Sequence, residues 1–122
     1  MPVNEEKLEE KAKGLGKAIG QTEAARAMDR ARETLEDNEE AWELFQDVQE
    51  LQQELLEKSQ QGEEVDEDKR DELQDMMKDL ESKKEYQQFV SAQMNFDKLM
   101  QKVNEHIQQG IEKGEDSKII EI

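Results

Sequence analysis

The sequence contains no cysteine, which excludes disulfide bonds, thiolate nucleophiles and every metal or iron–sulfur site built on cysteine sulfur. His106 is the only histidine, so one chain cannot assemble a two-histidine metal site or a histidine relay. We therefore expect no catalytic residue, no bound metal and no cofactor, and we predict that the protein is not an enzyme.

Proline and long apolar runs are also scarce. Pro2 is the only proline, so no proline interrupts a helix further along the chain. No stretch approaches the ~20 apolar residues needed to cross a bilayer, and the first residues lack the basic and apolar regions of a signal peptide. We expect a cytoplasmic protein that does not enter a membrane.

Acidic residues, in contrast, are abundant: 33 Asp and Glu against 17 Lys and Arg give a net charge of -16. This charge repels phosphate backbones and anionic lipid surfaces, so we expect no nucleic-acid partner and no membrane partner. The favoured interpretation is adaptation to a salty, halophilic cytoplasm, in which dissolved ions screen the self-repulsion. The alternative is a mimic of nucleic acid that occupies a basic site on another protein.

The apolar residues recur every three or four positions, which is the period of one face of a helix. In four consecutive segments the stripes are Leu8, Ala12, Leu15 and Ile19; Ala24, Met28, Ala31 and Leu35; Leu44, Val48, Leu51 and Leu55; and Leu73, Met76, Met77 and Leu80. A side chain suited to capping precedes each segment, namely Asn4, Thr22, Asn38 and Asp66. The pattern predicts four helices.

Two motifs, one containing glycines and one acidic, allow an interpretation other than helix. Gly14 and Gly16 could belong to a phosphate loop, but no strand precedes them. The acidic run at residues 66–72 could be a calcium loop, but it lacks the alternating ligands and the sixth-position glycine of an EF-hand. We favour helix for both segments, with Gly62 ending one helix so that the next returns as an antiparallel hairpin.

A fifth and longer helix is predicted from Ser82, which forms a capping box with Glu85. Phe89, Phe96 and Val103 recur every seven residues along it, as in a coiled coil. A helix to about residue 113 would be about 45 to 48 Å long, more than the ~35 Å expected across a compact globule of this size. We therefore expect self-association as a dimer or a larger homo-oligomer.

The predicted architecture is all-α: an elongated antiparallel helical hairpin or bundle of four to five helices with a long C-terminal helix. One domain would cover residues 1–113, and residues 114–122 would form a flexible tail. Large apolar side chains are the candidate protein-interaction residues, because such groups dominate interface energies. They are Trp42, Phe45, Phe89, Phe96, Leu99 and Val103, and the same residues could instead form the internal core.

Three parts of the sequence carry a resemblance to a known family: residues 15–19, residues 44–52, and residues 86–96 with 99–104. They resemble, in that order, the first helix, the central helix and, almost throughout, the last helix of the YlbF/YmcA family of small helical regulators. The chain looks like the YheA-like members of that family. The resemblance covers roughly residues 5 to 112 and depends on the order and spacing of these helices.

The resemblance implies an all-α regulatory adaptor that forms dimers or larger assemblies and has no enzyme activity. Some bacterial members assemble with related proteins and affect RNA processing, competence, sporulation and biofilm formation. This chain differs from the family in three respects. It lacks the prolines that often follow the caps near Asn38 and Ser82, it lacks the cysteines with which some members hold an iron–sulfur cluster, and its acidity and its tail lie outside the pattern.

The predicted function is a non-enzymatic adaptor that acts through self-association and protein contacts, with a link to RNA processing or developmental regulation implied by the family. A chaperone-like coiled-coil protein that holds unfolded clients is the alternative, suggested by the hairpin and the methionine content. Prefoldin-type subunits assemble through β-hairpins, and no alternating β-branched run is present.

Salt adaptation makes a direct prediction about stability. Raising KCl from physiological to molar concentration shortens the Debye length from ~8 Å to ~3 Å, so repulsion within a chain of charge -16 should weaken. We expect the melting temperature, followed by circular dichroism, to rise with KCl. A melting temperature that stays constant from low to molar salt would contradict this interpretation.

Overall fold

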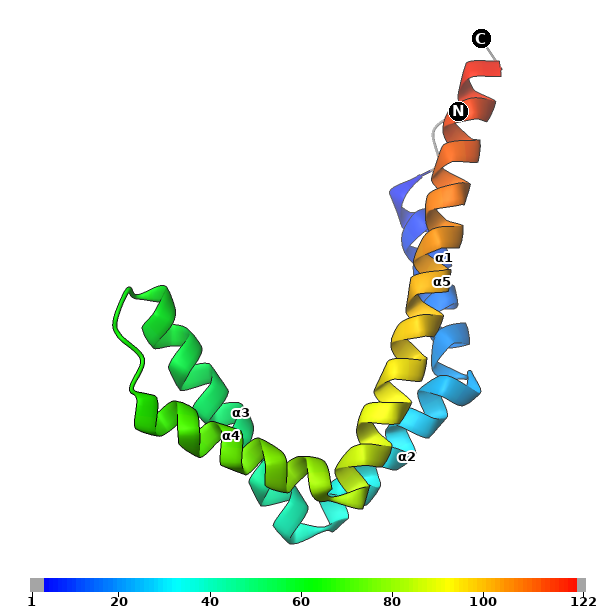
Figure 1. The fold of residues 1–122 in the computed structure, drawn as a ribbon. Helices are drawn as coiled ribbons and strands as arrows, with labels where there is room; N and C mark the ends of the chain where they lie inside the picture. Colours follow the sequence, from blue (N-terminus) through cyan, green and yellow to red (C-terminus); the bar gives the residue numbers. More distant parts are fainter. Residues whose placement is uncertain (1–3, 121–122) are drawn as a thin grey trace. The chain divides into compact units, whose positions relative to one another are not determined.

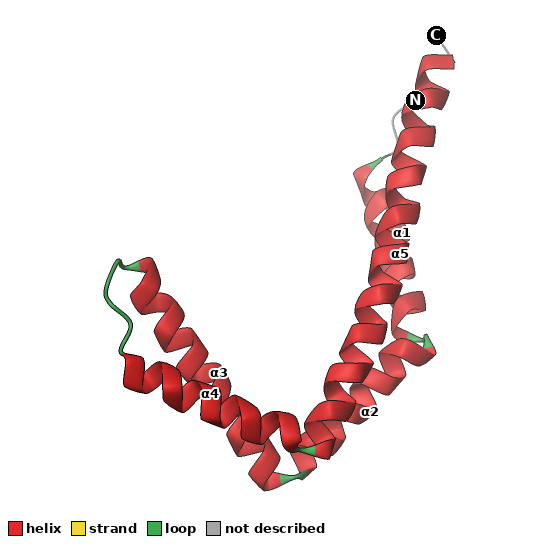
Figure 2. Cartoon of the chain, in the orientation of Figure 1, coloured by secondary structure: helices red, strands yellow, loops and turns green. Residues whose placement is uncertain are grey.

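A computed structural model describes residues 4–120, with the side chains of residues 4–115. This part of the chain contains five α-helices and no strand (Figures 1 and 2). The helices are α1 (Glu5–Gly20), α2 (Glu23–Asp37), α3 (Glu39–Gln60), α4 (Glu67–Ser82) and α5 (Lys84–Ile120). The prediction of an all-α fold with a long last helix is confirmed.

Four of the five helices begin at the capping residue that the sequence predicts. Each cap accepts a hydrogen bond from a backbone N–H of the first helical turn, which would otherwise lack a partner. The bonds run from Glu6 N to Asn4 Oδ1 (2.9 Å), from Ala25 N to Thr22 Oγ1 (3.2 Å), from Ala41 N to Asn38 Oδ1 (3.0 Å) and from Asp68 N to Asp66 Oδ1 (3.0 Å).

The end of α3 depends on Gly62, whose φ of 78° lies in the left-handed region that favours glycine. The N–H of Gly62 donates to the carbonyl of Ser59 at 3.2 Å, and the N–H of Glu63 donates to the carbonyl of Lys58 at 3.0 Å. These two bonds form a Schellman motif, which satisfies carbonyls of the last helical turn and reverses the chain toward α4.

The predicted capping box at Ser82 is wrong. Ser82 is the last residue of α4, and its hydroxyl donates back to the carbonyl of Asp79 at 2.6 Å. The chain extends at Lys83, and the first bond of α5 runs from Gln87 N to the carbonyl of Lys83 at 3.1 Å. A serine hydroxyl can bond a preceding carbonyl as readily as a following N–H, so the break lies one residue later than predicted.

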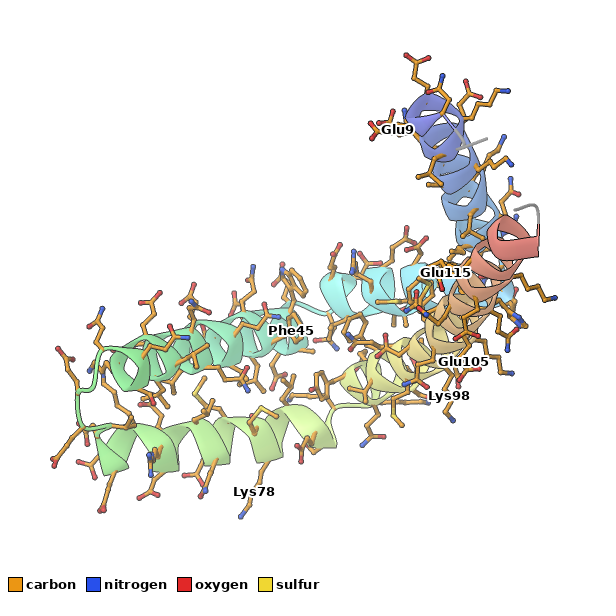
Figure 3. The ribbon with its side chains drawn as sticks, turned by 90° about the horizontal axis from the view of Figure 1, so that it is seen from above. Glu9, Phe45, Lys78, Lys98, Glu105 and Glu115 are labelled. Carbon is orange, nitrogen blue, oxygen red and sulfur yellow. The ribbon has the colours of Figure 1, made fainter. Side chains whose placement is uncertain are left out.

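The helices divide into two units, which we describe separately. The hairpin unit is Asp29–Ser91, and the terminal unit is Met1–Met28 together with Ala92–Ile122. In the hairpin unit, α3 packs antiparallel against α4, which confirms the predicted hairpin (Figures 1 and 3). The prediction of a single domain over residues 1–113 stays a prediction.

The buried apolar side chains gather almost entirely in the hairpin unit. Among the side chains described, those buried there are Ala31, Leu35, Ala41, Val48, Leu55, Leu80 and Phe89. Leu35 and Leu80 are 0% and 1% exposed, respectively. The terminal unit contributes only Ala92 to this described core, so its larger apolar side chains are covered in part or left in solvent.

Helix α5 continues past residue 113, where the sequence predicts its end, and reaches Ile120. Its 37 residues correspond to about 55 Å at 1.5 Å per residue. The predicted flexibility of residues 114–122 stays a prediction, and residues 121–122 lie outside the described part of the chain.

Two leucines of the hairpin provide a matched test of this core. Leu80→Ala should lower the free energy of unfolding by about 2 to 5 kcal/mol, because it removes a fully buried side chain and leaves a cavity. Leu56→Ala, at a position that is 52% exposed, should cost less than about 1 kcal/mol. Urea unfolding followed by circular dichroism measures both, and equal losses would contradict the assigned core.

Candidate protein-interaction surface

Four aromatic side chains form a cluster within the hairpin unit, two from α3 and two from the first turns of α5. Trp42 and Phe45 stack, with ring centroids 5.4 Å apart and an interplanar angle of 18°. Phe45 also contacts Tyr86 at 6.2 Å and the edge of Phe89 at 6.0 Å and 76°. These distances and angles are typical of favourable aromatic pairs. Phe45, labelled in Figure 3, therefore joins α3 to the start of α5.

Burial differs within this cluster. Phe89 is 8% exposed, whereas Trp42, Phe45 and Tyr86 are half-buried. Three of the predicted interaction residues, Trp42, Phe45 and Phe89, therefore contact one another or a shared neighbour inside a single chain. Their role in binding another protein stays a prediction, and their role in holding the hairpin unit together follows from the ring contacts.

The remaining predicted interaction residues, Phe96, Leu99 and Val103, belong to the terminal unit, where all three are half-buried along α5. The structure thus separates the six candidates into an aromatic set in one unit and a helix stripe in the other. Sequence reasoning omitted Tyr86 from the candidates. Its spacing of three residues from Phe89 places both on one helix face and was the available signal.

Large apolar side chains are exposed mainly in the terminal unit. Five of the six that the described part exposes belong to it, namely Leu8 (60%), Leu15 (40%), Met94 (55%), Ile107 (44%) and Ile111 (50%). The sixth is Leu56 of the hairpin unit. No residue of α1, all of which is described, is buried. In Figure 3 the first turns of α1, near the labelled Glu9, lie apart from α5.

The negative charge is concentrated in the hairpin unit, which exposes few large apolar side chains. The hairpin unit contains 22 Asp and Glu against 8 Lys and Arg, a net charge of -14. The terminal unit contains 11 against 9, a net charge of -2. The unit that exposes large apolar side chains is therefore nearly neutral, and the unit that buries them carries almost all of the negative charge.

Two ion pairs connect the helices of the hairpin. Lys69 of α4 pairs with Glu54 of α3, and Lys83, directly after α4, pairs with Glu40 of α3 at 2.7 Å. The hydrogen bonds in these pairs lower the pKa of both glutamates and raise the pKa of both lysines. The exposed fraction of the paired side chains ranges from 19% for Lys83 to 78% for Glu40, and ion pairs in such contact with solvent contribute little to stability.

An open groove lies between α3 and α4. Its walls are mostly carboxylates, with Leu51, Met76 and Lys69 between them. Within the described residues, no group of three or more His, Cys, Asp or Glu side chains is placed to hold a metal ion. No described helix is long and apolar enough to span a membrane.

Alanine substitutions of two phenylalanines distinguish a role in the core from a role in binding another chain. Phe89→Ala should reduce the free energy of unfolding by about 3 to 5 kcal/mol, because it removes a buried ring that contacts Phe45. Phe96→Ala, at a half-buried position of the terminal unit, should keep the helix content and weaken self-association. Urea unfolding and light scattering measure the two effects, and a loss of helicity in Phe96→Ala would assign Phe96 to the core.

The chain was compared with protein-family models, with curated proteins and with solved structures. A family model described as control of competence regulator ComK, YlbF/YmcA, matches residues 8–112. No curated protein and no solved structure matches the chain. The matched region extends from α1 across the hairpin and into the exposed stripe of α5. The resemblance seen in the sequence is confirmed, and the chain belongs to the YlbF/YmcA family of regulators.

Proposed function

We propose that this protein is a non-enzymatic regulatory adaptor that works by binding other proteins, beginning with a second copy of itself. The observation that carries the proposal is the set of large apolar side chains that the nearly neutral terminal unit exposes. Fully burying an exposed side chain of this kind contributes roughly 1.5 to 3 kcal/mol. These side chains are 40% to 60% exposed, so a partner that covers them gains about half of that free energy for each.

The distribution of charge favours the terminal unit as the surface for self-association. Two copies that met through their hairpin units would bring together two surfaces of net charge -14. Two copies that met through their terminal units would bring together surfaces of net charge -2. Like charges within a Debye length repel, so the terminal unit is the favourable place of contact.

The family supports a regulatory role for the assembled protein. Its description concerns control of the competence regulator ComK. We propose that the acidic hairpin units, left outside the contact between copies, face a salt-rich cytoplasm and remain free for regulatory partners. A link to RNA processing would follow from the resemblance to the wider family.

Mass measurement tests the self-association. Light scattering over a range of protein concentrations, at low and at molar KCl, should give a dimer or a larger assembly for the unmodified chain. Replacing Ile107 and Ile111 together by Gln should weaken association at least tenfold, since the lost apolar burial exceeds about 1.4 kcal/mol.

Leu56→Gln is the matched control, because Leu56 is equally exposed but lies in the hairpin unit. It should leave the mass unchanged. A monomer at every concentration and salt would refute the proposed self-association. Loss of assembly in Leu56→Gln, with the double variant still assembled, would place the contact on the hairpin unit instead.

A further inference from the structure

The open groove between α3 and α4 has an apolar floor, formed by Leu51 of α3 and Met76 of α4. Both side chains are only half-buried, and so are Leu73 and Met77 of α4. The groove has a volume of about 370 Å³. An apolar side chain of a partner placed in it would remove the exposed parts of Leu51 and Met76 from water, which is favourable.

Both ion pairs of the hairpin fit a single antiparallel register. Lys69 pairs with Glu54, and Lys83 pairs with Glu40. From the first pair to the second, the chain moves 14 residues back along α3 and 14 residues forward from Lys69 to Lys83. Because the steps are equal, the register does not shift between the two pairs. It therefore assigns which residues lie level with each other across the groove.

Apolar and acidic side chains alternate along the groove. In this register Leu51 lies level with Glu72, and four residues further along Asp47 lies level with Met76. Each level thus has one apolar side chain and one carboxylate, and Glu50 adds a further carboxylate to the lining. The two levels are about 6 Å apart, close to one turn of a helix. A partner helix can therefore reach both levels with side chains spaced three or four residues apart.

The carboxylates at the rim of the groove have no cation of their own. Asp47, Glu50 and Glu72 are exposed, and they form no ion pair within the described part of the chain. Lys69 is the one basic side chain among the described residues that line the groove, and it pairs with Glu54. An apolar floor between unpaired carboxylates matches a helix that carries both apolar and cationic side chains.

Charge argues against other occupants. A second copy would bring either a hairpin unit of net charge -14 or a terminal unit of net charge -2, and neither is basic. Nucleic acid and anionic lipid would be repelled by the same carboxylates. A basic segment of another protein is attracted instead, and a flexible methionine on the floor adapts to apolar side chains of different shape.

We infer that the groove between α3 and α4 binds a basic amphipathic helix of another protein. The apolar side chains of that helix cover Leu51 and Met76, and its lysine or arginine side chains meet the unpaired carboxylates of the rim. The inference rests on the proposed adaptor function and adds to it the class of partner and the place where the partner binds. That place shares no residue with the terminal unit, through which the copies are proposed to meet.

A synthetic peptide tests the inference on the full-length chain. The peptide is a fluorescent amphipathic helix of leucine, lysine and alanine, and its control has glutamate in place of every lysine. Fluorescence anisotropy should show binding of the lysine peptide only. Molar KCl should weaken this binding without abolishing it, because salt screens the carboxylates but not the contact with Leu51 and Met76.

Two double variants with the same change of charge locate the contact. Glu50→Gln with Glu72→Gln removes carboxylates of the rim and should weaken binding about tenfold. Asp71→Asn with Glu81→Gln removes exposed carboxylates from the opposite side of α4 by the helical period, and should weaken it less than about twofold. That side also carries Lys78, which points away from α3 in Figure 3.

Methionine methyl NMR measures the position of the peptide directly. The methyl signal of Met76, assigned with the conservative variant Met76→Leu, should shift when the lysine peptide is added. The signals of Met28 and Met94, which belong to the terminal unit, should not shift. Circular dichroism of every variant confirms that the helices are retained.

The outcomes separate this inference from the proposed self-association. Equal losses in the two double variants would indicate only general attraction between opposite charges and would overturn the inference. Equal binding of the glutamate peptide, no binding at any KCl concentration, or shifts at Met94 in place of Met76 would overturn it as well. In each of these cases the proposed function stands if light scattering finds a dimer or a larger assembly, because that measurement does not involve the groove.

Discussion

The fold is constrained by the small number of apolar side chains that are available to form a core. Hydrophobic residues make up 33% of the sequence and charged residues 41%, which leaves few side chains to form a core. The buried side chains are concentrated where α3 packs on α4 and where Phe45 and Phe89 join α3 to α5. The hairpin unit consequently folds around a core of its own, and the terminal unit is left with little beyond Ala92.

The net charge is divided between the two units as unevenly as the buried side chains are. The hairpin unit tolerates a net charge of -14 because its apolar side chains are already covered and its acidic groups can face solvent. The terminal unit is nearly neutral, and its Leu8, Ile107 and Ile111 are exposed. This combination of exposed apolar groups and low charge supports the proposal that the terminal unit binds protein, because contact there brings together the least like charge.

The proposed adaptor role requires a stable scaffold and a surface to which a partner can bind. The aromatic cluster joins α3 to the start of α5, and the ion pairs of Lys69 and Lys83 link α4 and the residue after it to α3. Within the terminal unit, the exposure of the apolar stripe of α5 increases from Ala92 to Ile111. The proposed function assigns binding to the terminal unit, whose exposed residues differ from those that form the core of the hairpin unit.

Local chemistry allowed the sequence by itself to determine the helices. Asn4, Thr22, Asn38 and Asp66 each cap the helix that follows, and Gly62 ends α3, because these effects act within a few residues. Ser82 failed as a predicted cap, since its hydroxyl could bond either neighbouring turn. The order and spacing of the predicted helices also allowed the family to be recognised from the sequence. Whether the side chains of each apolar stripe are buried or exposed, in contrast, was decided only by the tertiary structure. Phe89 and Ile107 occupy similar stripe positions in the sequence, yet one is buried against Phe45 and the other is 44% exposed, because burial depends on which helices lie nearby.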